Sequence, residues 1–389
     1  MRVAIITDRV YPFYMGGYEY SLFQYANILA QNNDVFVFTS FDNDSKKSSI
    51  FGSSVNLVKI TNRTSYVNKR DVHSTFGSIK YYFAILKQKR EIKDFDIVIL
   101  NSIPYIYGSS FLKLLKKNNL KLVVVFYEAW FHYLSSFNHN PIMGRILKRR
   151  IRMIALEASF IISISRSTTK SLVENYSVPD IKVMTIPIGI EKRTENLPKM
   201  EDRRFDLIFV GRLRSIKRIG DILESMKILL RERRDLKLAI VGDGNYRDSI
   251  LDSTERLGLR DYVKMTCTLE DDDKFSILRK SKIFILPSER EGLSVATLEA
   301  MQMGCIPIVA RPKYDEVFGL SHYFIDGFNG FEYPVGDIES LAKTINRLLG
   351  STDLQSEMSK NARETASNYT WDKIAILLKE ALDKMYSFS

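Results

Sequence analysis

The feature that most limits the fold of this chain is an alternation of short β-branched and aliphatic runs with longer stretches of helical periodicity. Such alternation is typical of parallel sheets that carry helices on both faces. The pattern breaks once, across the polar residues 191–204, and then restarts. We therefore predict an α/β fold with two doubly wound domains, over 1–190 and 205–370, joined by a linker at 191–204. The last stretch, 371–389, is expected to form an amphipathic helix.

The runs that we interpret as strands are short and bounded by turn residues. In the first domain they cover residues 3–7, 35–39, 55–60, 97–100, 122–126, 160–164 and 183–186, and in the second 206–210, 237–241, 262–265, 283–286, 306–309 and 322–325. Facing sheets of this kind bind a ligand in the crevice outside the carboxyl ends of their strands. We therefore expect the functional residues in loops that directly follow strands.

Positive charge is concentrated in the first half of the chain. Lys and Arg total 57 against 46 Asp and Glu in 389 residues, and residues 1–195 hold 27 of these bases against 15 of the acids. A one-sided excess indicates a field directed at something anionic, such as a nucleic acid, a membrane surface or a phosphorylated substrate. The basic segments carry no aromatic-interleaved sheet signature and no zinc-finger spacing, so we expect no nucleic acid partner.

The densest basic stretch predicts an amphipathic helix. Apolar residues such as Ile146, Ile151 and Ile154 recur at helical spacing among five bases, a pattern that resembles a helix lying on a membrane surface. An ordinary packing helix with a solvated basic face would give the same pattern, and both interpretations stay open. A second basic and aromatic segment, 80–90, favours the membrane. The candidate membrane or acceptor patch consists of Arg145, Lys148, Arg149, Arg150 and Arg152.

Composition also limits the location and the metal content. No apolar run approaches the roughly 18 residues that a spanning helix needs. Cys267 and Cys305 cannot staple a fold and have no partners at metal-ligand spacing. The three acids at 271–273 precede a helix, where they are favoured as capping residues. With a first strand that begins without a leader-like segment, we expect a cytoplasmic protein that binds no metal, either free or peripheral on the inner face of the cell membrane.

The most informative loop follows the strand at 283–286. It runs from Pro287 through Glu291 and the turn Gly292-Leu293-Ser294 into a helix that contains Glu299. A glycine turn at a helix N-terminus directs free backbone N–H groups toward a ligand, which suits a diphosphate. Glu291 and Glu299, roughly 7 Å apart along the helix axis, can each accept hydrogen bonds from vicinal hydroxyls. A loop Glu and a salt-bridged helix Glu would show the same spacing by chance.

Two other loops place glycine directly after a strand. Gly211-Arg212 and, five residues later, Lys217 supply two cations that could stabilise an anionic leaving group. Such a basic cluster is more often solvent-facing. Gly16-Gly17 allow close backbone approach to a ligand, although a flexible turn would use them equally well. Gly16-Gly17 do not form the Gly-x-Gly-x-x-Gly fingerprint, which disfavours a dehydrogenase.

Together these motifs resemble a known family. The string Pro-Ser-x-x-Glu-Gly-Leu followed by Glu-Ala-Met-x-x-Gly, at 287–304, is similar to the signature of retaining GT-B glycosyltransferases of the GT4 family, the glycosyl transferases group 1. The segment 211–217 resembles the family's Gly-Arg-Leu…Lys element. The resemblance covers about residues 1–385. It implies two Rossmann-like domains facing a central cleft, an acceptor-side domain at 1–190 and a nucleotide-sugar-binding domain at 205–370, with the C-terminal helix at 371–389 packing on the first domain.

The resemblance also implies a role for each site residue. Arg212 and Lys217 would neutralise the leaving nucleoside diphosphate without a metal, and no other cofactor is expected. The implied donor-binding residues are Gly16, Gly17, Arg212, Lys217, Glu291, Gly292, Leu293, Ser294 and Glu299. The candidate catalytic residues are Glu291, Arg212 and Lys217, together with Glu128, which stands where the chain departs from the family.

The chain departs from the family at one position. Many relatives carry a His at the end of the strand that corresponds to 122–126, and here the pair is Tyr127-Glu128. A phenol does not act as a histidine does near neutral pH. Either Glu128 or His132 takes over part of that role, or the family residue contributes only positioning.

We therefore expect a retaining hexosyltransferase that moves a sugar from a nucleotide-sugar donor to a hydroxyl of a lipid-linked or phosphate-bearing glycan at the cytoplasmic membrane face. Two alternatives stay open: a nucleotide-sugar epimerase or hydrolase of the same fold, and a catalytically idle scaffold that binds an anionic partner. The sequence does not indicate the sugar, the nucleotide base, the linkage or the oligomeric state.

Overall fold

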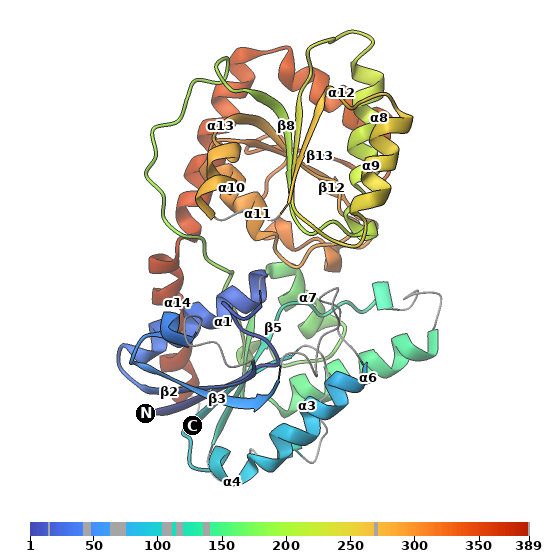
Figure 1. Ribbon diagram of the computed structural model, residues 1–389. Helices are drawn as coiled ribbons and strands as arrows, with labels where there is room; N and C mark the ends of the chain where they lie inside the picture. Colours follow the sequence, from blue (N-terminus) through green and yellow to red (C-terminus); the bar gives the residue numbers. More distant parts are fainter. Residues whose placement is uncertain are drawn as a thin grey trace. The chain divides into compact units, whose positions relative to one another are not determined.

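The computed structural model describes residues 1–14, 16–41, 48–62, 75–102, 111–113, 120–134, 141–267 and 271–387. The chain divides into two compact units (Figure 1). One unit combines Met1–Gly189 with Trp371–Ser389, and the other is Ile190–Thr370. Each unit is a parallel sheet with helices packed on it.

The first unit contains a seven-stranded sheet in the order β3-β2-β1-β4-β5-β6-β7, with every neighbouring pair parallel. The strand order reverses between β1 and β4, where Val3 lies between Val35 and Ile97. Strand β1 is fully buried from Val3 onward, as expected for a central strand covered on both faces. The strands are β1 Arg2–Ile6, β2 Asp34–Ser40, β3 Val55–Thr61, β4 Ile97–Asn101, β5 Lys121–Phe126, β6 Phe160–Ser163 and β7 Val183–Thr185.

The C-terminal helix belongs to the first unit. The Trp371 ring centroid lies 6.2 Å from that of Tyr20 and 6.4 Å from that of Tyr25, so the helix packs on α1, as Figure 1 shows. A Cβ at Gly189 would lie 2.7 Å from the Trp371 ring, so this approach requires glycine. The helices of this unit are α1 Gly17–Ala30, α3 Thr75–Lys87, α4 Lys89–Ile92, α6 Pro141–Glu157, α7 Arg166–Glu174 and α14 Trp371–Ser387, with short 3-10 turns at Ser49–Phe51 and Asp180–Lys182.

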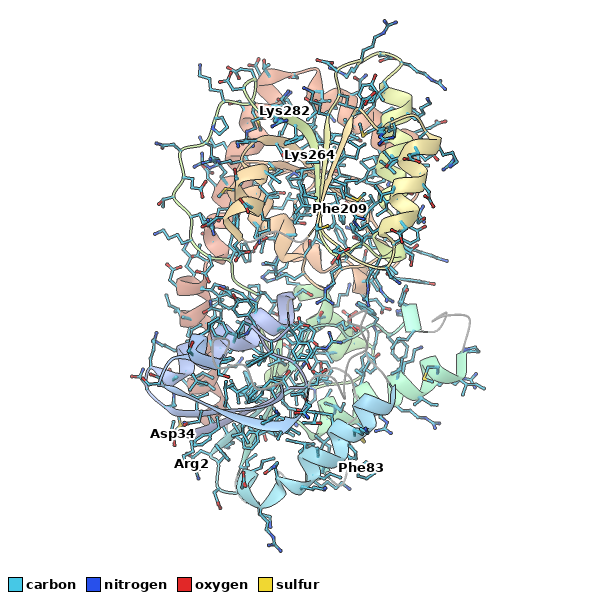
Figure 2. All side chains as sticks on the ribbon, viewed as in Figure 1. Arg2, Asp34, Phe83, Phe209, Lys264 and Lys282 are labelled. Atoms are coloured by element: carbon cyan, nitrogen blue, oxygen red, sulfur yellow. The ribbon has the colours of Figure 1, made fainter. Side chains whose placement is uncertain are left out.

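The second unit contains a six-stranded parallel sheet in the order β10-β9-β8-β11-β12-β13. Its strands are β8 Phe205–Val210, β9 Leu238–Val241, β10 Val263–Thr266, β11 Ser281–Leu286, β12 Ile306–Arg311 and β13 Phe331–Pro334. Its helices are α8 Ile219–Leu229, α9 Arg247–Arg256, α10 Asp271–Leu278, α11 Val295–Gln302, α12 Ile338–Leu349 and α13 Thr352–Ala366, with 3-10 turns at Ser215–Lys217, Asp315–Val317, Gly319–His322 and Ser367–Tyr369. The side chain of Phe209, labelled in Figure 2, belongs to the buried core between these layers.

One local expectation was wrong. The stretch 322–325 is a turn rather than a strand, because Asn329 accepts a hydrogen bond from the Ile325 N–H and donates one to the Tyr323 carbonyl. The last strand lies later, at β13. The described residues 191–204, predicted as a linker, contain no helix or strand, and near their end Arg203 packs on the second unit: it is 5% exposed and donates to the Ser281 carbonyl at 2.6 Å.

Candidate active site

The loop after β8 is held by core packing and by glycine. Leu213 is fully buried, and truncating such a side chain to alanine costs about 2–5 kcal/mol. Its N–H donates to the Asp243 carbonyl at 2.9 Å, which joins this loop to the one after β9. A Cβ at Gly242, whose φ is 149°, would lie 1.9 Å from the Gly211 carbonyl oxygen. Gly242 therefore fixes the backbone before Arg212 and the Leu213 hydrogen bond fixes it after, while Arg212 itself is partly exposed.

The loop after β11 is fixed on two sides by backbone hydrogen bonds. The Glu289 N–H donates to the Ile216 carbonyl at 3.0 Å, which ties it to the loop after β8. The Glu291 N–H donates to Val317 at 2.9 Å, and the Gly319 N–H donates back to Glu291 at 2.9 Å. A Cβ at Gly319 would lie 1.5 Å from the Gly292 carbonyl oxygen, so only glycine fits there.

These loops bring two of the expected site residues into contact. The Lys217 ammonium donates to Glu291 Oε1, and the two side chains are 18% and 14% exposed. The next residue, Arg218, stands in the left-handed region at φ 47° and pairs with Asp221 at 2.8 Å and with Glu289 at 3.5 Å. The hydrogen bond to Asp221 raises the pKa of Arg218. Cations and carboxylates therefore alternate along this edge of the second sheet.

Helix α11 begins beside this ion pair. Ser294 is its N-cap at φ 63°, and no side chain among the described residues caps the helix. The Leu293 side chain is buried, and the Tyr323 hydroxyl donates to the Leu293 carbonyl at 2.8 Å. Burial raises the pKa of Tyr323 well above its ordinary value, so its hydroxyl remains a donor. The Thr297 N–H donates to the Ser294 carbonyl at 3.2 Å, so the first-turn amides of α11 that face an anionic ligand are those of Val295 and Ala296.

Glu299 has a partner that the sequence analysis missed. The Lys274 ammonium lies 2.9 Å from Glu299 Oε1 and 3.1 Å from the Asp271 carboxylate, and Glu299 and Lys274 are each 17% exposed. Burial raises the pKa of Glu299, and the charge of Lys274 opposes that rise. Asp271, Asp272 and Asp273 occupy the first turn of α10, as a set of capping acids would. No group of metal-ligand type was found among the residues that the structure describes.

Gly16 and Gly17 lie at the start of α1 in the first unit. The helix begins at Gly17, with the extended Gly16 as N-cap and no side-chain cap in the described chain. Glu19 in its first turn is 1% exposed, and its Oε1 lies 3.7 Å from Nη1 of the equally buried Arg9. A buried ion pair of this kind ties the end of β1 to the glycine turn.

Tyr127, which stands at the position predicted to correspond to a family histidine, is buried. The Tyr127 hydroxyl lies 2.6 Å from Ser21 Oγ and the residue is 5% exposed. Burial raises the pKa of Tyr127 well above its ordinary value, so it stays neutral. Glu128 follows it with a partly exposed side chain, whereas His132 is exposed on the surface. Of the two candidates, Glu128 is the residue next to the end of β5.

Helix α6 places the basic patch on a surface that also exposes apolar side chains. Arg145, Arg149 and Arg152 are exposed, while Lys148 and Arg150 are partly buried. The Lys148 ammonium lies 3.9 Å from the centroid of the Phe131 ring. Three large apolar residues of the helix are exposed as well: Ile142 at 68%, Met143 at 44% and Ile146 at 46%. Within the described ranges, no helix is long and apolar enough to cross a membrane.

Two family models match the chain in succession. The Glycosyltransferase Family 4 model matches residues 15–194, and the Glycosyl transferases group 1 model matches residues 191–365. An uncharacterized glycosyltransferase of Haemophilus influenzae is 25% identical over 300 residues, covering 76% of this chain and 79% of the relative. The capsular polysaccharide biosynthesis glycosyltransferase CapM of Staphylococcus aureus is 24% identical over 243 residues, covering 59% of this chain and 62% of CapM, less than two thirds of its length.

Solved structures share the architecture. The crystal structure of Anabaena HepE in complex with UDP and glucose matches with a TM-score of 0.74 at 17% identity, covering 98% of this chain and 99% of that one. At this identity the likeness concerns the fold. Two parallel-sheet units, glycine-fixed loops with their ion pair, and two consecutive family models lead to one conclusion: the chain belongs to the GT4-type glycosyltransferases, enzymes of the GT-B fold.

Proposed function

We propose that this glycosyltransferase transfers a sugar from a nucleotide-sugar donor to an acceptor hydroxyl with retention of the anomeric configuration. The observation that carries the proposal is the Lys217–Glu291 pair beside the uncapped start of α11. The cation and the free amides at this sheet edge match the charged diphosphate of such a donor. The carboxylate matches the hydroxyls of its sugar. The UDP and glucose named for the HepE structure are ligands of this chemical class.

The chemistry needs charge stabilisation more than a strong nucleophile. The bond between the anomeric carbon and the phosphate oxygen breaks, and the diphosphate gains negative charge. Arg212, Lys217 and the first-turn amides of α11 would stabilise that charge, so no metal is required. The acceptor oxygen bonds to the anomeric carbon on the same face, and its proton passes to the departing phosphate. Glu291 holds the sugar hydroxyls during this exchange.

For the acceptor we propose a lipid-linked or phosphate-bearing glycan at the inner face of the cell membrane. Helix α6 supports this, because its exposed Arg145, Arg149 and Arg152 adjoin the exposed Ile142 and Ile146. Cations bind anionic head groups, and apolar side chains between them insert at the acyl boundary. The relative CapM is named for capsular polysaccharide biosynthesis, a process with large glycan products.

The donor half of the proposal is tested without knowledge of the acceptor. A bound ligand raises the midpoint of thermal unfolding by mass action, so purified protein is screened with UDP, GDP, ADP and their sugars in the presence of a chelator. We expect one base to stabilise the wild type and Glu299→Ala and Arg212→Ala to abolish the shift. Failure of every nucleotide to stabilise the folded protein would instead favour an idle scaffold.

Retention and transfer are tested next. With the identified donor and a lipid-linked acceptor, nuclear magnetic resonance of the product reports the anomeric configuration. A product that forms only with acceptor excludes epimerisation and hydrolysis. An inverted product, or loss of activity that only a divalent cation restores, would contradict the mechanism.

A further inference from the structure

Lys274 lies between two carboxylates at the carboxyl edge of the second sheet. Its ammonium is 2.9 Å from Glu299 Oε1 on α11 and 3.1 Å from Asp271 Oδ1 on its own helix, α10. Its side chain is 17% exposed, so the charge is largely shielded from water. Lys274 therefore joins α10 to α11 through Glu299, one of the predicted donor-binding residues.

The pairing has a consequence for Glu299. A carboxylate has two oxygens, and an ammonium that binds one of them restricts rotation of the group and directs the other. Burial raises the pKa of Glu299, and Lys274 lowers it again, with Arg193 adding to the lowering and Asp271 opposing it. Lys274 therefore orients the Glu299 carboxylate and opposes the rise in its pKa that burial causes.

We infer that Lys274 is a positioning residue that fixes the Glu299 carboxylate for hydrogen bonding to the ribose hydroxyls of the donor. The inference rests on the proposed function, because Glu299 is one of the donor-binding residues and needs a nucleotide-sugar donor with ribose hydroxyls to bind. It adds a specificity element: an oriented, charged acceptor distinguishes a ribonucleotide from one that lacks the hydroxyls, since charge-assisted hydrogen bonds are the strong ones.

The molecule supplies a matched control for this pair. Lys282 lies 2.8 Å from Asp206 Oδ1, and the two side chains are 19% and 18% exposed. Lys282 is near the start of β11 and Asp206 near the start of β8, so this pair lies at the amino edge of the same sheet. Figure 2 shows Lys282 at that end, away from Phe209 farther along β8. Replacing Lys282 therefore removes an ion pair of similar burial and leaves the candidate donor site unchanged.

The experiment compares two ligands on full-length variants. Whichever of UDP, GDP or ADP stabilises the wild type is titrated calorimetrically beside its 2′,3′-dideoxy analogue. The wild type should bind the ribo form about thirtyfold more tightly. Lys274→Met should weaken the ribo form about tenfold and leave the dideoxy form unchanged. Lys274→Arg should restore most of the ribo preference, and Lys282→Met should bind both ligands as the wild type does.

The outcomes separate the two claims. If Lys274→Met weakens both ligands alike, or keeps the ribo preference, the lysine is structural and the inference is wrong. If Glu299→Gln keeps the ribo preference while the wild type still binds, the ribose role of Glu299 fails instead. If the wild type binds no nucleotide, the proposed function falls and takes the inference with it. Circular dichroism shows whether each variant is folded. If Lys274→Met does not fold, Lys274→Gln is used in its place.

Discussion

The carboxyl edge of the second sheet and helix α6 of the first unit both carry clustered charge, but they hold it differently. Lys217 and Lys274 each pair with a carboxylate from another element and are 17–18% exposed. Arg145, Arg149 and Arg152 on α6 are exposed, and none of them forms an ion pair within the described chain. Paired, shielded cations suit one ligand of fixed shape, whereas a solvated row of arginines suits a diffuse anionic surface.

The largest effect should come from the shielded region. Lys217→Ala removes a fixed cation from the leaving diphosphate, and we expect kcat/KM to fall about a thousandfold. Steady-state kinetics with the identified donor measure this. Lys282→Ala, which breaks a pair of equal burial at the other edge of the sheet, should stay within about threefold of the wild type. An equal fall of kcat/KM in the two variants would mean that the loss of activity comes from breaking a buried ion pair and not from its location at the site.

The exposed region should affect surface binding instead. Replacing Arg145, Arg149 and Arg152 together by Gln removes three charges near the bilayer, each contributing about 1 kcal/mol, so binding to anionic vesicles should fall about a hundredfold. Co-sedimentation with phosphatidylglycerol vesicles measures the partition coefficient. Nucleotide affinity should not change. If the wild type binds neutral and anionic vesicles equally, the proposed acceptor at the membrane surface is wrong.

A smaller effect distinguishes a membrane from a soluble polyanion. Ile142→Ser with Ile146→Ser leaves the arginines of α6 in place but removes two exposed apolar side chains. Vesicle binding should drop about tenfold, because the apolar contribution to insertion is lost. Binding to heparin should be unaffected. A parallel loss on heparin would show that the helix itself has been disturbed.

The smallest effect is expected at the amino edge of the second sheet, where Cys305 is fully buried. Burial raises the pKa of Cys305 to about 12, so its thiol stays protonated near neutral pH. In a Cys267→Ser variant, iodoacetamide at about pH 8 should label no cysteine until the protein unfolds. Mass spectrometry measures the label, and rapid modification of the folded protein would mean that this edge opens.

Most of the fold could be predicted because buried parallel strands are continuous apolar runs, and a run such as residues 207–210 has few other interpretations. The last strand could not, because the stretch 322–325 has better strand residues than Phe331–Pro334, which contains Glu332 and Pro334. Hydrogen bonds of Asn329 with Tyr323 and Ile325 decide between them, and the Asn329 amide also donates at 3.1 Å to Oγ1 of Thr365, a residue 36 positions away.

The site divides in the same way. Glu291 and Lys217 follow strands, so their convergence at one sheet edge was predictable from topology. Lys274 stands among three acids at the start of a helix, where a lysine is usually a surface residue. Only the packing of α10 near α11 brings it to Glu299, 25 residues away. A local sequence pattern contains no information on that distance.

The glycine contacts at the site have a bearing on protein engineering. Gly242 packs on the Gly211 carbonyl and Gly319 on the Gly292 carbonyl, with no room for a Cβ at either Gly242 or Gly319. Libraries that seek a new sugar donor should therefore randomise side chains around the loops and leave these glycines untouched. A graft into another scaffold must carry the segments around residues 211, 242, 292 and 319 together. The backbone at 211 packs against Gly242, and the backbone at 292 packs against Gly319, so neither segment of a pair keeps its conformation alone.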